Sequence, residues 1–298
     1  MNGDLVKLLV YGAGVLGSRF AARLHEAGQD VALLARGERL AALRRHGVQL
    51  AEGDSPDIRR VPVPIVEHPA GGYDLTAVFV RTHQVDAVLQ SLAGLDGDVL
   101  FLLNWAAGPE PLGAVIGPGR VLLGFGADGG TMDGDVVRYR PASRLTRLVP
   151  TPIGEPDGRR TPRLDRIVGT FRAAGINAKP EPRVDAWLKT HAAFEVPLGQ
   201  AVLAAGGPAA LAADPAAVRR MIRRIRQSLA ALPVAPVPRG FAALRTLPEG
   251  LLVAVFRRFL RSPTVTHSGL NTTSPAAEAA ELDRLAEQLR AYARVRPS

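Results

Sequence analysis

The sequence has no cysteine among its 298 residues. Disulfide bonds and thiolate chemistry are therefore excluded, and cysteine usage leaves the compartment open. Four scattered histidines show no spacing typical of metal ligands, and we expect no bound metal. They are His25, His46, His68 and His83.

The chain also lacks a long apolar run. Its longest stretch without a charged residue, 196–213, contains two prolines and three glycines, whereas a membrane-spanning helix needs about 20 apolar residues in succession. A strand predicted from Leu5 onward argues against an N-terminal signal peptide. We therefore expect no membrane segment and a cytoplasmic location.

Aromatic residues and lysines are scarce. Aromatics make up 5 % of the chain, and only three of its 37 basic residues are lysines. The net charge of +9 would suit a nucleic-acid partner, but the arginines are spread over the whole chain and form no basic stripe interleaved with stacking aromatics. We expect no nucleic-acid partner and ascribe the charge to an arginine-favouring coding bias with some affinity for phosphorylated ligands.

The length and composition are those of a globular protein large enough for two domains. Apolar residues make up 47 % and charged residues 22 %. Strand and helix patterns alternate up to about residue 180, and mainly helical patterns follow. This order predicts an α/β domain over 1–180, an all-helical domain over 181–298, and a small-molecule site in the cleft between them. A helix predicted over 185–203 is expected to be interrupted at Pro197.

A glycine-rich turn follows the first predicted strand, 5–11. In such a turn the first glycine permits the sharp bend, the second lets the backbone approach a pyrophosphate, and the third lets the following helix pack on the strand. A second apolar run, Val31–Leu34, completes a strand–helix–strand unit. The pattern predicts a Rossmann-type domain that binds dinucleotide phosphates at a helix N-terminus. The residues of the turn are Gly12, Ala13, Gly14, Val15, Leu16 and Gly17.

Arg36 follows the second predicted strand. An acidic residue at this position would bind the ribose 2′-hydroxyl of NAD, whereas an arginine accommodates the 2′-phosphate of NADP. Arg39 lies one turn further on. The sequence therefore predicts NADP, and the alternative is that Arg36 is a solvated surface charge.

Several other segments come directly after predicted strands. They are Arg81, Asn104 and the glycine-rich segment 124–130. Since ligands bind beyond the carboxyl ends of strands in open α/β sheets, we expect these residues to border the same crevice as the glycine turn. Two further strands are predicted at 136–139 and 144–149.

Together these motifs resemble the ketopantoate reductase (2-dehydropantoate 2-reductase) family over nearly the whole chain. The segment Arg81–Gln84 stands where the family has Lys-x-x-Gln near the cofactor, and Asn104 stands at the family's Asn-Gly pair. Trp187-Leu188-Lys189 matches the family's Trp-x-Lys helix, whose lysine is the general acid. The resemblance implies a Rossmann-type domain followed by a helical domain. It also implies cofactor contacts from Arg81, Gln84 and Asn104, and catalytic roles for Lys189 and Asn104.

The chemistry of hydride transfer suits these two catalytic candidates. Transfer to a carbonyl builds negative charge on oxygen, which a proton donor and a hydrogen-bond donor must neutralise. Lys189 would supply the proton, and Asn104 would hold the substrate oxygen or fix the nicotinamide edge. The alternative for Lys189 is a solvated helix lysine.

Other polar positions of the family are altered in this chain. Ala193 and Val196 stand where the family has substrate-binding asparagines, and Ser262-Pro263 stands near its substrate-binding glutamate. A site without those groups should bind ketopantoate poorly. We therefore expect a more apolar pocket, with Ala193, Val196 and His267 as candidate lining residues. Its substrate would be a carbonyl or imine compound less polar than ketopantoate.

His191 and Glu195 lie four residues apart on the same predicted helix, so we expect them to form a structural pair. Two functional alternatives stay open. The fold could serve non-redox chemistry, as a cyclase, an isomerase or a binding module, or the protein could be a 2-dehydropantoate 2-reductase itself. Apolar faces in the helical domain favour a homodimer.

Overall fold

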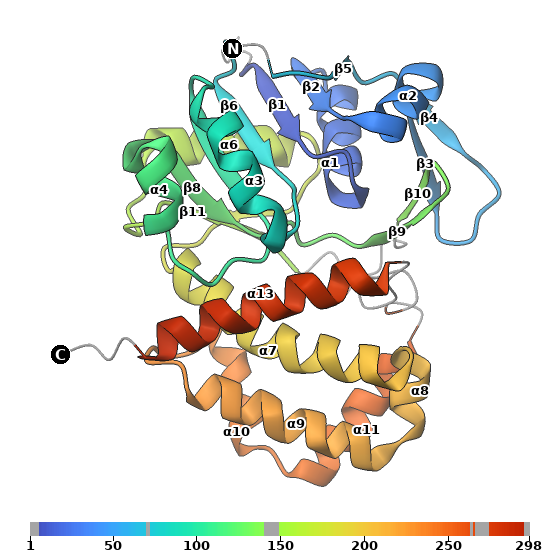
Figure 1. Ribbon diagram of the computed structural model, residues 1–298, viewed down its shortest axis with the longest axis vertical. Helices are drawn as coiled ribbons and strands as arrows, with labels where there is room; N and C mark the ends of the chain where they lie inside the picture. The colour runs from blue at the N-terminus through green and yellow to red at the C-terminus, as the bar shows by residue number, and fades with distance from the viewer. Residues whose placement is uncertain (1–5, 70–71, 140–148, 263–264, 266–273, 295–298) are drawn as a thin grey trace. The chain divides into compact units, whose positions relative to one another are not determined.

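The computed structural model describes residues 6–69, 72–139, 149–262, 265 and 274–294. The chain forms two compact units (Figure 1). The first contains residues 1–103 and 109–184, and the second contains residues 104–108 and 185–298. The short segment 104–108 therefore belongs to the second unit, although it directly follows a strand region of the first.

An eight-stranded sheet forms the centre of the first unit, in the order β12-β11-β8-β7-β6-β1-β2-β5. Its strands are β1 (Leu8–Tyr11), β2 (Val31–Leu34), β5 (Ile65–Val66), β6 (Leu75–Val78), β7 (Asp98–Leu102), β8 (Val121–Gly124), β11 (Thr151–Gly154) and β12 (Ala178–Pro180). Neighbouring strands are parallel except for the antiparallel pair β8 and β11. From β5 to β8 the order is that of a doubly wound dinucleotide-binding sheet, and the turn after β1 lies where the winding direction reverses.

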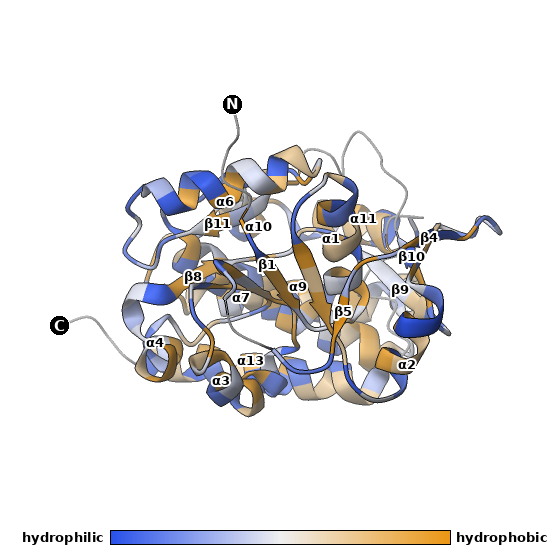
Figure 2. Ribbon diagram, turned by 90° about the horizontal axis from the view of Figure 1, so that it is seen from above, coloured by the Kyte–Doolittle hydropathy of each residue, from blue (hydrophilic) through white to orange (hydrophobic). Residues whose placement is uncertain are grey.

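Helices cover both faces of this sheet, with α6 and α3 on opposite sides of the apolar strand β1 (Figure 2). The helices are α1 (Val15–Glu26), α2 (Gly37–His46), α3 (Val85–Ala93), α4 (Glu110–Ile116) and α6 (Pro162–Ala173), with short 3₁₀ helices η1 (Thr82–Gln84) and η2 (Pro118–Arg120). Phe20 of α1 packs on Phe79 and Phe171, at ring-centroid distances of 4.7 and 5.9 Å. These aromatic contacts hold the helix after the glycine turn against the sheet.

A second, four-stranded sheet lies in the same unit, in the order β4-β3-β10-β9. Its strands are β3 (Val48–Glu52), β4 (Arg59–Val61), β9 (Gly130–Asp133) and β10 (Val136–Tyr139). The strand predicted at 136–139 is thus confirmed as β10. The strand predicted at 144–149 lies, except for its last residue, outside the described residues.

In its described residues the second unit is helical, and the predicted fold class is confirmed. Its helices are α7 (Val184–Ala205), α8 (Pro208–Ala213), α9 (Pro215–Ala230), α10 (Ala243–Thr246), α11 (Glu249–Leu260) and α13 (Pro275–Arg294), with the short 3₁₀ helix η3 (Arg239–Ala242). Apolar side chains of α7, α8, α9 and α11 form one core. Asp214 caps α9, because its Oδ1 accepts hydrogen bonds from the backbone N–H groups of Ala216 and Ala217 at 2.8 and 3.0 Å.

Helix α7 continues without a break through Pro197, so the predicted interruption is wrong. A proline inside a helix removes a backbone hydrogen bond and costs about 3 kcal/mol or more. The residues after it, Leu198 and Val202, are only 1 % and 3 % exposed. Burial of each such side chain stabilises by about 1.5–3 kcal/mol, which offsets the lost bond.

The C-terminal helix α13 packs against α7 and the segment 104–108. Leu282 and Leu285 of α13 share a buried cluster with Ala106, Ala192 and Val196. The backbone N–H of Ala106 also donates to Oε1 of Gln288 at 2.9 Å. These contacts explain why the segment belongs to the helical unit. Across the described part of the chain, we find no helix with the length and apolarity that a membrane crossing requires.

Candidate cofactor and active-site residues

The glycine turn after β1 requires glycine at two positions for steric reasons. Gly12 has φ +111°, and a Cβ there would collide with the carbonyl oxygen of Phe79. A Cβ on Gly17 would collide with the carbonyl oxygen of Gly12. Gly14 differs, because a Cβ there would meet no atom within 4 Å. The structure therefore leaves open space in front of the glycine that is predicted to approach a pyrophosphate.

Side chains brace this turn from behind. The carbonyl oxygen of Ala13 accepts hydrogen bonds from Ser18 Oγ at 3.1 Å and from Arg39 Nε at 3.2 Å, and Arg39 Nη2 donates to Ser18 Oγ at 3.2 Å. Helix α1 begins with Gly14 as N-cap, has no side-chain cap and no acidic residue in its first turn. Its first backbone N–H groups are therefore suited to an anion. Arg39 serves this turn structurally, a role that sequence spacing did not reveal.

Arg36 lies between β2 and α2, where the sequence predicts the ribose-binding position. Its side chain is exposed, and its Nη2 donates to the hydroxyl of Tyr11 at 3.1 Å. Tyr11 is 3 % exposed and ends β1. The buried tyrosine thus anchors an exposed guanidinium beside the glycine turn.

Arg81 and Gln84 close the turn after β6. The backbone N–H of Arg81 donates to Gln84 Oε1 at 3.1 Å, and the backbone N–H of Gln84 donates to the carbonyl oxygen of Arg81 at 2.8 Å. These two bonds give Gln84 a local role in ordering the start of α3.

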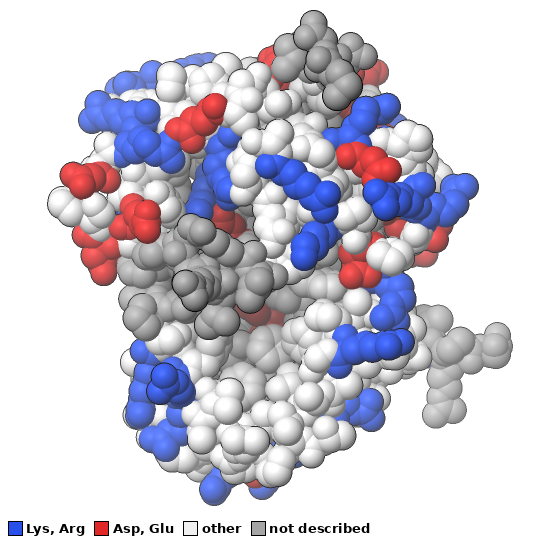
Figure 3. Space-filling view, turned by 180° about the vertical axis from the view of Figure 1, so that it is seen from behind, with Lys and Arg blue, Asp and Glu red and all other residues white. Residues whose placement is uncertain are grey.

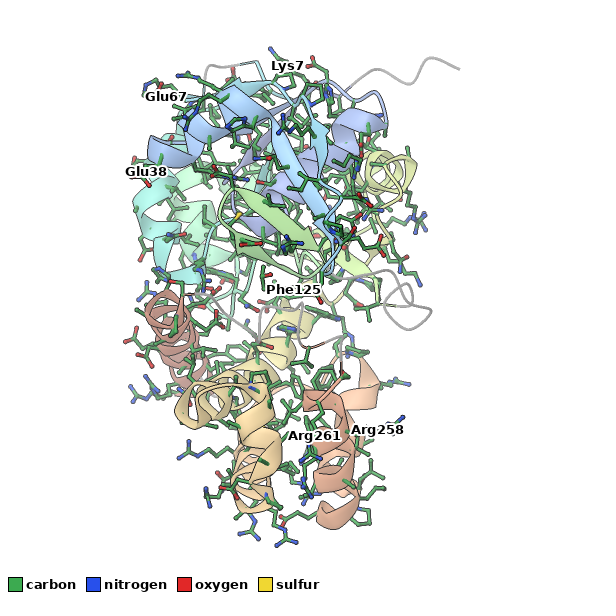
Figure 4. The ribbon with its side chains drawn as sticks, turned by 90° about the vertical axis from the view of Figure 1, so that its right-hand side faces the viewer. Lys7, Glu38, Glu67, Phe125, Arg258 and Arg261 are labelled. Carbon is green, nitrogen blue, oxygen red and sulfur yellow. The ribbon has the colours of Figure 1, made fainter. Side chains whose placement is uncertain are left out.

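The segment 124–130 borders the glycine turn, as its position after β8 predicts. A Cβ on Gly126 would lie 3.4 Å from Leu16 Cδ1, and one on Gly130 would lie 3.0 Å from Val15 Cγ1. Phe125, labelled in Figure 4, stands at the start of this segment. Asp128, in the same segment 124–130, forms an ion pair with Arg19 of α1 at 2.8 Å. This ion pair connects the segment to the helix after the glycine turn.

In the helical unit, Lys189 is buried rather than solvated. It is 4 % exposed, its Nζ lies 2.5 Å from Asp185 Oδ2, and it lies 3.9 Å from the ring centroid of Tyr292 on α13. Burial and the Asp185 carboxylate raise the pKa of Tyr292. The carboxylate and the aromatic ring therefore hold the Lys189 side chain from two sides.

Asn104 contacts His191 of α7. The distance between Asn104 Oδ1 and His191 Nδ1 is 3.2 Å. The His191 ring stacks on Trp187, one turn earlier, with centroids 5.2 Å apart and an interplanar angle of 9°. Burial lowers the pKa of His191 to about 4, so the ring is neutral at pH 7.

The candidate pocket residues have different surroundings. Ala193 is fully buried in the core formed by α7, α8, α9 and α11. Val196 is 6 % exposed and packs in the cluster that contains Ala106. His267 lies outside the described residues.

The predicted pair of His191 and Glu195 is wrong, because the two side chains form no hydrogen bond or ion pair within the described residues. Glu195 instead faces the carboxylates of Glu278 and Glu281 on α13, and burial together with these charges raises its pKa to about 7. Helical spacing put both residues on one side of α7, but tertiary packing gave each a different neighbour.

Glu195→Gln is expected to stabilise the protein at alkaline pH. Because the pKa of Glu195 rises from 4.5 to about 7 on folding, the folded state binds more protons, and the free energy of unfolding falls as pH increases through this window. At pH 8 the variant should gain about 1–3 kcal/mol, and near pH 4.5 it should match the wild type. Thermal unfolding at both pH values measures this difference.

Glu249→Gln provides the matched control, because Glu249 is ion-paired with Arg223 at 3.0 Å. Its pKa is lowered by that arginine, so the control should not gain stability at pH 8. Equal melting temperatures for Glu195→Gln and wild type at pH 8 would contradict the inferred repulsion.

The basic residues form separate groups on the face shown in Figure 3, and acidic side chains lie between them on the α/β unit. Arg257 of α11 and Arg261, directly after this helix, both donate to the carbonyl oxygen of Ala212, at 2.9 and 3.3 Å, and thus cap the end of α8. Figure 4 labels Arg261 and, three residues earlier on α11, Arg258. Arg257 and Arg261 thus have a structural function in the fold.

Comparison with known protein families agrees with this fold and turn. Residues 8–147 match the family model described as "Ketopantoate reductase PanE/ApbA". A 2-dehydropantoate 2-reductase of Mesorhizobium japonicum is 26 % identical over 211 residues, which is 62 % of this chain and 63 % of that protein. One from Archaeoglobus fulgidus is 29 % identical over 174 residues, 58 % of this chain and 55 % of that protein. The alignments thus span less than two thirds of these relatives.

Solved structures share the whole two-unit fold. The 2-dehydropantoate 2-reductase from Geobacter metallireducens GS-15 has a TM-score of 0.66 and 17 % identity, with 96 % of this chain and 98 % of that chain covered. D-mandelate dehydrogenase in complex with NADH and anilino(oxo)acetate has a TM-score of 0.67 and 17 % identity, with 96 % and 98 % covered.

The predicted resemblance to the ketopantoate reductase family is therefore confirmed in sequence and in fold. Proteins of this family are oxidoreductases that act on CH–OH groups and bind nicotinamide dinucleotides.

Proposed function

We propose that this protein is an NADPH-dependent reductase of the ketopantoate reductase family that acts on a carbonyl or imine group of a substrate less polar than ketopantoate. The observation that carries the proposal is the glycine turn with its open front at Gly14. Rigid bracing behind the turn, open space before it and an uncapped helix N-terminus fit a dinucleotide pyrophosphate. The residues that would hold it are Gly12, Ala13, Gly14, Val15, Leu16 and Gly17.

Arg36 supports NADP over NAD. An exposed guanidinium anchored on Tyr11 suits a doubly charged 2′-phosphate, and the position carries no carboxylate for the 2′-hydroxyl. The D-mandelate dehydrogenase neighbour was crystallised with NADH, so cofactor preference has to be measured for this chain.

In the proposed reaction the cofactor, when bound, supplies a hydride to the carbonyl carbon. Lys189 holds a proton at Nζ for the oxygen that becomes negative. Asp185 Oδ2, 2.5 Å from Nζ, holds the amine in place. The Asn104 amide orients the same oxygen, so that hydride and proton together convert the carbonyl to an alcohol.

The substrate class follows from the residues that replace polar groups of the family. Ala193 and Val196 offer no hydrogen bonds, and both are buried among apolar neighbours of the helical unit. Neither side chain can bind the additional hydroxyl of ketopantoate, whereas an apolar carbonyl compound would need no such hydrogen bond. The homodimer and the cytoplasmic location stay predictions.

Arg36→Ala tests the cofactor assignment. Loss of the charge-assisted contacts is expected to weaken NADPH binding about tenfold or more, and NADH binding should not change. Titration of protein fluorescence with each cofactor measures both dissociation constants. Arg44→Ala is the matched control, since this exposed arginine of α2 pairs with Glu67 at 3.4 Å. Equal affinity of the wild type for both cofactors would refute the NADP assignment.

A substrate screen separates the remaining alternatives. NADPH absorbance is followed while products are analysed by mass. Stoichiometric NADPH oxidation with apolar ketones supports the proposal, whereas product formed without oxidation supports a cyclase or isomerase. Ketopantoate as the best substrate would identify a 2-dehydropantoate 2-reductase.

A further inference from the structure

The excess positive charge of the chain is concentrated in one part of the helical unit. Residues 208–262 contain ten arginines, no lysine and only two acidic residues, which gives them a net charge of +8, whereas the whole chain carries +9. The rest of the chain is therefore nearly neutral. An arginine-favouring coding bias does not explain this concentration, because replacing lysine by arginine leaves the net charge unchanged.

The two acidic side chains of this stretch are each already paired with an arginine of α9. Asp214 lies 3.7 Å from Arg220. Glu249 lies 3.0 Å from Arg223. On the face of the helical unit shown in Figure 3, basic side chains lie around a largely uncharged surface. Eight of the ten arginines are exposed, namely Arg219, Arg220, Arg223, Arg224, Arg239, Arg245, Arg258 and Arg261.

A stripe of exposed apolar side chains runs along α11. Residues at intervals of four lie on one side of a helix, and the residues of this apolar stripe are Leu247, Leu251, Val255 and Phe259. Their exposed fractions are 38, 51, 52 and 38 %. Large apolar side chains are exposed at only three further positions among the described residues. The opposite side of α11 packs into the core of the helical unit, so the apolar stripe faces away from that core.

Two exposed arginines flank the apolar stripe. Arg245 of α10 lies two residues before Leu247, and Arg258 of α11 lies directly before Phe259. Neither guanidinium forms an ion pair or a hydrogen bond with another residue that the structure describes. Both positive charges are therefore available to a partner that also covers the apolar stripe.

The combination of charge and apolar surface favours one kind of partner over two others. A second copy of this chain would bring an equal positive charge against the same face, and like charges repel. A nucleic acid would attract the arginines but would leave the apolar stripe against phosphates, whereas nucleic-acid interfaces are polar. A membrane with anionic lipid suits both features. Its headgroups attract the arginines, and apolar side chains enter the boundary between headgroups and acyl chains.

We propose that the apolar stripe and its flanking arginines dock the helical unit on the surface of a membrane that contains anionic phospholipid. The side chains of the stripe enter the headgroup layer, and no segment crosses the bilayer. The proposal is independent of the proposed reductase function, because it involves none of the cofactor-binding or catalytic candidates. Its test therefore needs no substrate and no cofactor.

Sedimentation with vesicles tests the docking in the full chain. We expect the protein to bind vesicles of phosphatidylcholine and phosphatidylglycerol about tenfold or more tightly than vesicles of phosphatidylcholine alone, since each arginine near an anionic surface contributes about fivefold. Added salt should weaken the binding, because it screens the attraction between exposed charges.

A double variant measures the contribution of charge. Arg245→Glu/Arg258→Glu should weaken binding to the anionic vesicles about 30-fold or more, because it removes two attractive charges and adds two repulsive ones. Arg60→Glu/Arg166→Glu is the matched control. Both of these arginines are exposed on the α/β unit, so the control changes the net charge equally and should bind within about threefold of the wild type.

A second double variant measures the contribution of the apolar stripe. Leu251→Gln/Val255→Gln keeps the charge and the helix propensity of α11 but removes two apolar side chains. It should weaken binding to the anionic vesicles about tenfold. Ile58→Gln is the control, because Ile58 is also an exposed apolar residue, at 45 %, but belongs to the α/β unit. This control should bind like the wild type.

Thermal unfolding verifies that each variant is folded. Absence of wild-type binding to anionic vesicles, equal binding to neutral and anionic vesicles, or equal binding by Arg245→Glu/Arg258→Glu and its control would each overturn the proposal. Retention of a double-stranded DNA oligonucleotide without binding to vesicles would identify a nucleic acid as the partner instead. A wild-type dimer that binds no vesicles and that Leu251→Gln/Val255→Gln dissociates would assign the apolar stripe to a second copy of the chain.

Discussion

Lys189→Met is expected to lower kcat for carbonyl reduction about 100- to 10,000-fold, the range for loss of a positioned proton donor. Methionine keeps the length and the apolar stem of lysine but supplies no proton to the developing alkoxide. NADPH affinity should stay nearly unchanged, because the predicted cofactor-binding turn belongs to the other unit. Single-turnover measurements of NADPH oxidation compare the hydride-transfer step in both proteins.

Two further variants distinguish proton donation from charge and from stability. Lys189→Arg keeps a positive charge beside Asp185, but its pKa is too high for a useful acid, so it should also be inactive. Lys189→Met leaves the Asp185 carboxylate, 29 % exposed, without its ion-pair partner. The double variant Lys189→Met/Asp185→Asn also removes the unpaired carboxylate. It should fold like the wild type while remaining inactive. Normal turnover by Lys189→Met would rule out the proton-donor role.

Gly17→Ala is expected to abolish measurable cofactor binding and to destabilise the first unit by about 1–3 kcal/mol, the usual cost of overpacking. A Cβ at this position would collide with the carbonyl oxygen of Gly12. Because the obstacle is backbone, the collision can only be relieved if helix α1 moves away from the turn. Calorimetric titration with NADPH and thermal unfolding measure the two effects.

Two other glycines provide controls for the steric argument. Gly14→Ala should fold normally, because its Cβ meets no protein atom within 4 Å, but should lose NADPH affinity because the methyl group would occupy the space of the pyrophosphate. A Cβ on Gly169, in helix α6, would also meet no atom within 4 Å. Gly169→Ala should therefore bind NADPH normally and gain about 0.5–1 kcal/mol in the free energy of unfolding. Unchanged stability of Gly17→Ala would contradict the predicted collision.

The sequence was sufficient for the features that depend on local backbone. The spacing of the glycine turn is required because Gly12 has a positive φ and a Cβ on Gly17 would collide with the carbonyl oxygen of Gly12. The strand–helix alternation around it likewise follows from hydrophobic periodicity, which is a property of neighbouring residues. These signals predicted the two-unit fold and the family resemblance correctly.

Sequence reasoning failed where neighbours come from distant segments. Pro197 was expected to interrupt α7, but burial of the residues after it kept the helix intact. His191 was paired with Glu195 from helical spacing alone, yet its partner is Asn104, 87 residues earlier. Spacing along one helix shows which side chains share a face, and it does not show what packs against that face.

The sequence by itself determined the Rossmann-type turn and the arginine that follows the second strand, because local spacing and residue type define them. The lysine of the Trp-x-Lys helix was singled out by the resemblance to the ketopantoate reductase family. Only the tertiary structure decided that Lys189 is buried between Asp185 and Tyr292, that Arg39 braces the turn, and that the segment after β7 joins the helical unit. Each of these depends on contacts between segments far apart in the chain, and the energy of burial and of hydrogen bonds across those contacts is not encoded in any single stretch of sequence.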